Sequence, residues 1–311
     1  MKLNRRRLLK ASLAVGALAA TQSSWAKGDV AERHPHSRSH EVGFPNPKTS
    51  NLLMQCCLLA ASQVVSLPPK FILTDHQNSV QPSGINPELF DRHTQIASFQ
   101  AQVPHFYEPQ FHGVALKLSD QAAIYGKLQN FGLALRSPHH NIIALQISPS
   151  DAEWLQYASA RPTDFDPHQP EQGQVHSRVK QLYAALKPQI QAVTQHIDPV
   201  LPCYVTGYSL GGAIAHLAAA EIALNLPQLR EKIQVYSFGA PRLGDRAFAT
   251  FYDALLPRTY RMVNLADRIP LLPPSRLAYQ HIGQQQTYVA QEDTLELNHA
   301  IETYRDAARF S

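Results

Sequence analysis

Cysteine is scarce in this sequence, which excludes stabilisation by a network of disulfide bonds. Its 311 residues contain three cysteines, too few for a disulfide framework. Cys56 and Cys57 stand in the apolar run 52–65, and Cys203 stands in a strand-like run. We therefore expect three buried thiols and a fold that forms without disulfides, even in a reducing compartment.

An apolar run long enough to cross a bilayer is also missing near the N-terminus. The stretch 11–20 falls short of the roughly 20 residues that a membrane-spanning helix needs. It follows the basic segment Asn4–Lys10 and precedes the small residues around Ser24–Ala26, as in an export signal. The two arginines before Leu8 and Leu9 resemble a twin-arginine signal, and an ordinary Sec signal is the alternative. Residues 1–26 thus predict export, to the periplasm or out of the cell, and no transmembrane span.

Excess positive charge disappears once that signal is removed. The whole chain carries a formal charge of +4, but residues 1–26 hold five cations and no acid, so the remainder carries −1. No basic surface is left to suggest binding to nucleic acid or to an anionic membrane.

Regular structure is expected mainly in the second half of the chain. Residues 27–50 read as a flexible lead-in, and 51–311 as a single domain of a size that one core can support. The segment 51–65 predicts a buried helix, whereas 66–111 predicts no element. A hairpin is expected at 131–145.

Short apolar strands then alternate with longer amphipathic helices. We predict helices at 175–197, 210–224 and 246–256, and strands at 201–206, 233–238 and 260–265. This alternation is typical of an α/β fold with a largely parallel sheet and helices on both faces.

A candidate nucleophile stands where the second of these helices begins. Ser209 lies in the segment Gly207–Gly212, with glycine two residues before and two after it. A nucleophile elbow needs such glycines, because strand and helix approach each other closely at the turn. The N–H of Leu210 at the helix start would then face a developing oxyanion. The alternative is a glycine-rich turn with an inert serine.

A serine hydrolase of this type also needs an acid and a histidine later in the chain. Asp267 follows a predicted strand, whereas Asp245 lies in a loop and Asp253 within a helix, so Asp267 is the candidate acid. His299 precedes the terminal helix with freedom to reach Ser209.

Two other histidines follow the serine and are weaker candidates. His216 points away within the elbow helix, and His281 stands in the strand-like segment 279–282. The remaining histidines, including His139 and His140, have no spacing typical of metal ligands, and we expect them to be solvated.

Several blocks of sequence resemble the class 3 lipase family, which contains the fungal triacylglycerol lipases. They are Val205–Ala213, Tyr236–Asp245, Val263–Pro270, Tyr279–Gly283 and Asn298–His299. The resemblance extends over roughly residues 131–304. It implies an α/β-hydrolase fold in which Ser209 is the nucleophile, Asp267 the acid and His299 the base. It also implies hydrolysis of acylglycerols or related lipid esters through an acyl-enzyme, without cofactor or metal.

The sequence departs from the family at two positions near the expected site. The family has Phe-Arg-Gly-Thr or Phe-Arg-Gly-Ser where this chain has Leu145–Ser148. Ser148 keeps a hydroxyl for the second oxyanion contact, but Ile147 replaces a glycine and resists positive φ. Tyr208 stands where the family commonly has histidine.

The segment 149–172 occupies the position of the family's lid. Its apolar residues Trp154, Leu155 and Tyr157 suit a cover that opens during transient contact with a lipid surface. A plain surface loop is the alternative.

Three functions other than an acylglycerol lipase remain open on the sequence. Two are hydrolases, a phospholipase A1 and a short-chain esterase. The third is a descendant without catalysis that binds acyl chains or a protein, which the altered segment Leu145–Ser148 suggests.

Overall fold

The fold was analysed in a computed structural model, which describes residues 45–63, 85–102, 110–111, 114–115, 128–146 and 161–308. The predicted signal 1–26, Ser148, Trp154, Leu155 and Tyr157 lie outside the described residues, and so does most of the lead-in 27–50.

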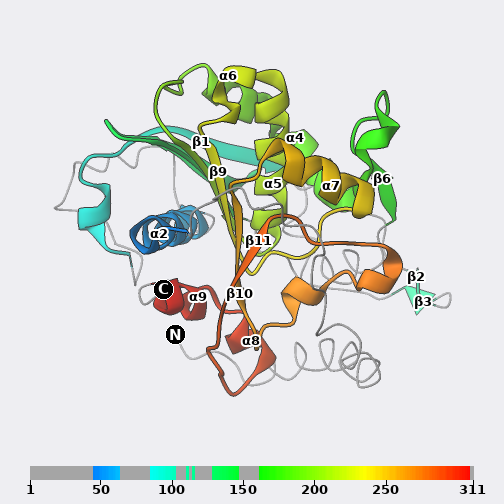
Figure 1. The fold of residues 1–311 in the computed structure, drawn as a ribbon. Helices are drawn as coiled ribbons and strands as arrows, with labels where there is room; N and C mark the ends of the chain where they lie inside the picture. The colour runs from blue at the N-terminus through cyan, green and yellow to red at the C-terminus, as the bar shows by residue number, and fades with distance from the viewer. Residues whose placement is uncertain are drawn as a thin grey trace.

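A seven-stranded sheet forms the centre of the molecule (Figure 1). In spatial order its strands are β1 (Thr94–Gln102), β4 (Leu128–Arg136), β5 (Asn141–Gln146), β8 (Cys203–Tyr208), β9 (Ile233–Phe238), β10 (Thr259–Asn264) and β11 (Gln284–Tyr288). β4 pairs antiparallel with both β1 and β5, and every pairing from β5 to β11 is parallel. The largely parallel sheet expected from the sequence is therefore confirmed.

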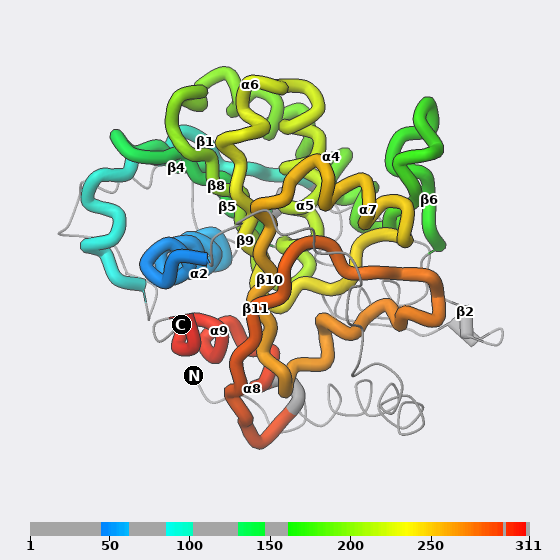
Figure 2. The backbone as a smooth tube through the Cα atoms, in the orientation of Figure 1, coloured from blue at the N-terminus to red at the C-terminus, as the bar shows by residue number. Residues whose placement is uncertain are grey.

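Helices cover both faces of the sheet, which explains why its central strands are buried along almost their whole length. All six residues of β5 are buried, as strands between two helical layers require. One layer contains α4 (Ser177–Thr194), α5 (Leu210–Asn225) and α7 (Arg246–Leu255). The other contains α2 (Pro47–Gln63) and α9 (Ile301–Ala308), which contact each other although they come from opposite ends of the chain (Figure 2).

Shorter elements complete the described part of the fold. They are η2 (Pro87–Phe90), β2 (Gln110–Phe111), β3 (Val114–Ala115), β6 (Pro162–Asp164), η3 (Pro170–Gln172), β7 (Gln174–His176), α6 (Pro227–Arg230), η4 (Ile269–Leu271), η5 (Ser275–Leu277) and α8 (Leu295–Asn298). The segment 161–172, expected to be loop, thus contains β6, which pairs with β7.

Two strands of the sheet, β1 and β11, were not predicted, and one segment expected to be strand-like is not a strand. β1 contains two register shifts, which break the period-2 pattern by which strands are recognised. β11 has the polar sequence QQQTY, and its residues alternate between half-buried and exposed because one edge of the sheet ends there. The strand-like segment 279–282 contributes only an isolated bridge at Gln280.

The burial of the three cysteines and of two histidines can be compared with the expectations from the sequence. Cys56, Cys57 and Cys203 are buried and free, as predicted. His139 is exposed, as expected, whereas His140 is half-buried, with its Nε2 2.8 Å from Nε2 of His93 on the chain segment leading into β1. Burial, followed by the neighbouring His93 and His139, lowers the pKa of His140 to about 4.

Candidate active site

Ser209 occupies a strained turn between β8 and α5. Its φ of 57° and ψ of −130° lie in a region that non-glycine residues rarely adopt, at a cost on the order of 1–3 kcal/mol. The turn is held because the N–H of Ser209 donates to the carbonyl of Phe238 on the neighbouring β9 at 2.8 Å. Such strain at a buried serine is the geometry that a nucleophile elbow needs.

Two glycines make this turn possible because side chains have no room there. A Cβ on Gly207 would lie 2.3 Å from the carbonyl oxygen of Gly211. A Cβ on Gly211 would lie 2.4 Å from the carbonyl oxygen of Leu145 in β5. Helix α5 therefore starts directly against the sheet, and the N–H of Leu210 at its first position has no helical carbonyl within reach.

Asp267 lies in the turn that follows β10. Its backbone N–H donates to the carbonyl of Asn264 at 2.9 Å, which closes the turn. Its Oδ1 accepts from the N–H of Ile269 at 2.9 Å. The carboxylate has no solvent exposure, so this bond and the partners of Oδ2 fix its orientation.

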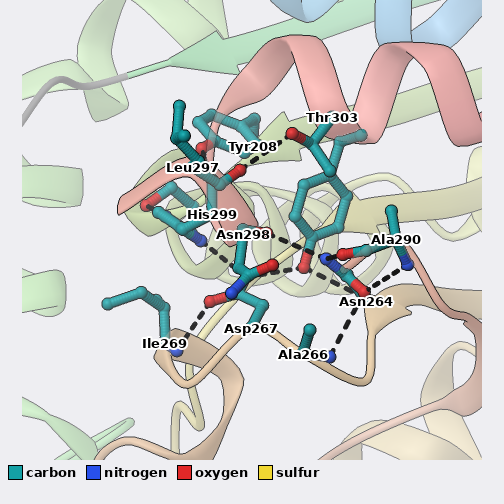
Figure 3. Close-up of polar contacts among 12 residues, drawn as sticks. Tyr208, Asn264, Ala266, Asp267, Ile269, Ala290, Leu297, Asn298, His299 and Thr303 are labelled. Carbon is teal, nitrogen blue, oxygen red and sulfur yellow. Dashed lines mark hydrogen bonds and ion pairs between the residues drawn. The ribbon is translucent and has the colours of Figure 1, made fainter. Parts of the chain in front are cut away.

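His299 connects the other two residues. It lies between α8 and α9, and its Nδ1 is 2.6 Å from Oδ2 of Asp267 (Figure 3). Its Nε2 is 2.8 Å from Oγ of Ser209. The structure therefore brings Ser209, Asp267 and His299 into one continuous chain of polar contacts.

Tyr304, which the sequence did not single out, is a further partner of Asp267. Its hydroxyl donates to Oδ2 of Asp267 at 2.6 Å and accepts from the N–H of Asn264 at 3.2 Å. Burial first, and then the charge of Asp267, raises the pKa of Tyr304, so it remains a neutral donor. Its place on the terminal helix, five residues after His299, is the signal that could have indicated it.

Asn264, at the end of β10, joins the turn that contains Asp267 to the segment that contains His299 between α8 and α9, here called the histidine loop (Figure 3). Its Nδ2 donates to the carbonyls of Ala290 and Asn298 at 2.9 and 3.0 Å. Its Oδ1 accepts from the N–H groups of Ala266 and Ala290 at 3.2 and 3.0 Å. One buried amide therefore fixes the backbone immediately before His299.

The rival acids stand elsewhere and have structural roles. Asp245 caps α7 by accepting from the N–H of Phe248 at 2.8 Å, and Asp253 accepts from the N–H of Gly283 at 2.6 Å.

The rival histidines, His216 and His281, are both buried, and the imidazole that meets Oγ of Ser209 is that of His299. Burial, followed by the charge of Arg261, lowers the pKa of His216 to about 3. The same two causes, with Arg242, lower the pKa of His281. Both therefore stay neutral at ordinary pH.

A hollow of about 860 Å³ borders the histidine loop between β11 and α9. Leu297 and Ala300 line it, but none of Ser209, Asp267 and His299 does. In the described ranges, no three His, Cys, Asp or Glu side chains are grouped as metal ligands. The helices described there also include none with the length and hydropathy needed to span a bilayer.

Known proteins with similar sequences share this central part of the chain. Residues 142–277 match the family described as lipase (class 3). A secreted mono- and diacylglycerol lipase, MDL3 of Malassezia globosa, is 29% identical over 223 residues, which cover 63% of this chain and 68% of that protein. The central part of the chain is therefore similar to the class 3 lipases. Its matching part contains Ser209 and Asp267, whereas His299 lies beyond it.

A second protein is similar to this chain in sequence, and a solved structure is similar to it in fold. Lipase ZK262.3 of Caenorhabditis elegans is 46% identical over 70 residues, which cover 22% of this chain but only 20% of that lipase. The triacylglyceride lipase of Rhizomucor miehei superposes with a TM-score of 0.54 at 20% identity, covering 78% of this chain and 81% of that one. The fold of this chain is therefore the α/β-hydrolase fold, as the resemblance implied.

Proposed function

We propose that this protein is a class 3 lipase, a serine hydrolase that cleaves carboxylic esters of acylglycerols. The observation that carries the proposal is the contact chain from Oγ of Ser209 through the imidazole of His299 to the buried carboxylate of Asp267. A strained, buried serine whose hydroxyl meets a carboxylate-bound imidazole is equipped for nucleophilic catalysis.

The first half of the reaction forms an acyl-enzyme. Oγ of Ser209 attacks the ester carbonyl while Nε2 of His299 takes its proton, and Asp267 stabilises the imidazolium and holds its tautomer. His299 then returns the proton to the departing alcohol as the tetrahedral intermediate collapses. In the second half, water attacks the acyl group while His299 takes its proton, and His299 passes that proton to Oγ of Ser209 as the bond to the acyl group breaks and the acid product leaves.

Two donors are proposed for the oxyanion. The N–H of Leu210 stands at the first position of α5, directly after Ser209. Ser148 would supply the second donor. It follows β5 closely in sequence, but it lies outside the described residues. Loss of one such donor has cost about 10²–10³-fold in rate in a hydrolase studied that way.

Acylglycerols are proposed as substrates because a relative over most of the chain is named a mono- and diacylglycerol lipase. A phospholipase A1 and a short-chain esterase use the same residues. Hydrolysis of p-nitrophenyl esters from acetate to palmitate, and of monoacylglycerol, diacylglycerol, triacylglycerol and phospholipid emulsions, separates the three. We expect long-chain esters and acylglycerols to react fastest. A preference for acetate or for phospholipid would refute the acylglycerol assignment.

We also propose export, with residues 1–26 as a twin-arginine signal, 27–50 as a lead-in and 51–311 as the domain. The N-terminal sequence supports it, and several relatives are named secreted. The first described helix, α2, begins at Pro47, inside the proposed lead-in. N-terminal sequencing of the exported protein, in cells with and without twin-arginine translocation, tests the signal and its cleavage after Ala26.

A fluorophosphonate probe tests whether the protein is a catalyst or a binder. We expect one label on the mature protein, located by mass spectrometry on Ser209 and absent from Ser209→Ala. An unlabelled wild type that still binds fatty acid would favour the alternative of a descendant without catalysis.

A further inference from the structure

Tyr208, the residue before the nucleophile, points into the same layer as α2 and α9. Side chains alternate along β8, so Tyr204, Thr206 and Tyr208 share one face of the sheet. Thr206 contacts Cys57 of α2, with Oγ1 and Sγ 3.6 Å apart, and Tyr208 belongs to the same buried cluster. Its side chain therefore lies beneath the histidine loop, on the opposite side of the sheet from α5.

Tyr208 contacts His299 in two independent ways. The two rings are stacked, with centroids 5.1 Å apart and planes inclined by 24°. The hydroxyl of Tyr208 also donates to the backbone carbonyl of His299. Both residues are labelled in Figure 3. A single buried side chain thus holds the plane of the imidazole and the backbone that carries it.

Tyr208 stacks on a face of the imidazole, whereas the other groups described around the ring contact its edge. Asp267 contacts Nδ1 and Ser209 contacts Nε2, both at the edge of the ring. The ring of Tyr304 lies 6.2 Å away at an interplanar angle of 79°, an edge-type contact. An aromatic face is electronegative and attracts a cation within about 6 Å. Tyr208 is therefore placed to interact with the positive charge that His299 acquires when it takes the serine proton.

The phenol stays neutral while it does so. Burial first, then the charges of Asp267 and Glu302, and then the Cys57 thiol raise the pKa of Tyr208. The hydroxyl therefore remains a donor throughout the pH range in which an imidazole titrates.

We propose that Tyr208 is a positioning residue of the esterase reaction, which orients the imidazole of His299 and stabilises its protonated form from the ring face. This inference rests on the proposed function. It also gives a reason for the departure from the family, which commonly has histidine at this position. A second imidazole would repel the imidazolium whenever it was itself protonated, whereas tyrosine does not.

Two substitutions separate the hydroxyl from the ring. Tyr208→Phe keeps the ring and removes the bond to the carbonyl, so we expect kcat to fall roughly three- to tenfold with the pH profile unchanged. Tyr208→Leu removes both, so kcat should fall about 10- to 100-fold. Because the imidazolium then loses its aromatic partner, the acidic limb of the kcat/KM profile should move to lower pH by about half to one unit. KM should stay within about twofold, since Tyr208 is inferred to act through His299.

Tyr204→Leu is the matched control. Tyr204 lies on the same strand and face, about 13 Å away along β8, and its ring contacts His140 and Tyr236 instead of His299. It should lower thermal stability as Tyr208→Leu does, but leave kcat and the acidic limb unchanged.

The outcomes distinguish this inference from the proposed function. If wild type is not labelled on Ser209 by fluorophosphonate, the esterase assignment itself fails. If wild type is labelled and turns over ester, but Tyr208→Phe and Tyr208→Leu both retain wild-type kcat and the wild-type acidic limb, Tyr208 only packs and the inference is overturned. A Tyr204→Leu variant that shifts the acidic limb equally would overturn it as well.

Discussion

The two halves of the site are held in place by different kinds of interaction. Ser209 is positioned by backbone geometry, because two glycines allow β8 and α5 to meet and the neighbouring β9 fixes the turn. His299 is positioned by side chains, chiefly the amide of Asn264, the hydroxyl of Tyr208 and the carboxylate of Asp267. We infer that substitutions at the elbow should damage the fold, whereas substitutions around the histidine loop should damage catalysis first.

The largest effect is expected from breaking the elbow. Gly211→Ala places a methyl group 2.4 Å from the carbonyl oxygen of Leu145, a contact that requires β5 and α5 to separate. We expect destabilisation by several kcal/mol, on the order of an overpacked core, and little soluble protein. Thermal unfolding and expression yield measure it. Ala213→Gly, in the same helix, should stay soluble, and a Gly211→Ala protein as stable as wild type would contradict the account of the elbow.

A smaller effect, on catalysis rather than on folding, is expected at Asn264. Asn264→Asp keeps the shape but replaces the Nδ2 donor by an acceptor that faces the carbonyls of Ala290 and Asn298. The histidine loop should shift, and kcat/KM should fall about 100-fold, as for a misplacement near 1 Å. Steady-state kinetics and circular dichroism measure the two properties on the same sample. The exposed Asn225, at the end of α5, offers Asn225→Asp as a control. If Asn264→Asp unfolds but its folded fraction keeps the wild-type kcat, the proposed difference between the elbow and the histidine loop is contradicted.

Tyr304→Phe should have a more modest effect. It removes the hydroxyl that donates to Oδ2 of Asp267 at 2.6 Å while preserving the ring. His299 and the N–H of Ile269 still bind the carboxylate, so we expect kcat to fall about tenfold, as for one hydrogen bond to a charged group. Tyr252→Phe, on α7, provides a buried tyrosine control. An unchanged kcat for Tyr304→Phe would mean that the remaining partners orient Asp267 sufficiently.

The smallest effect on activity, and a selective effect on stability, is expected at His216 in the elbow helix. Neither of its ring nitrogens has a hydrogen-bond partner among the described residues, and its pKa is lowered from 6.5 to about 3. In the unfolded chain His216 takes up a proton near pH 6.5, whereas in the folded chain it stays neutral until about pH 3. The free energy of unfolding therefore falls as the pH drops from 6.5 towards 3. The loss approaches about 1.4 kcal/mol per pH unit.

His216→Leu removes this dependence, so its stability should fall less steeply over that pH range, with kcat at neutral pH within about twofold of wild type. Urea unfolding at pH 7, 5 and 4 measures the slope. The exposed His139 offers His139→Leu as a control that keeps the wild-type slope. Equal slopes for His216→Leu and wild type would contradict the role assigned to burial.

The same contrast explains how much the sequence could predict. The elbow and the parallel strands followed from local patterns, namely glycines around a serine and apolar runs alternating with helices. Asn264, Tyr304 and Tyr208 act on groups 34, 37 and 91 residues away in the chain. Local periodicity carries no information about such pairs. β1 and β11 were missed for a related reason, since edge strands with bulges or polar residues lack the pattern of a buried strand.

The central claim is that His299 activates Ser209, and the rate of fluorophosphonate labelling tests it most directly. We predict that the label appears on Ser209, that the rate falls about 10³-fold or more in His299→Asn, and that His139→Asn labels at the wild-type rate. Labelling of His299→Asn at the wild-type rate, or attachment to another residue, would contradict the account.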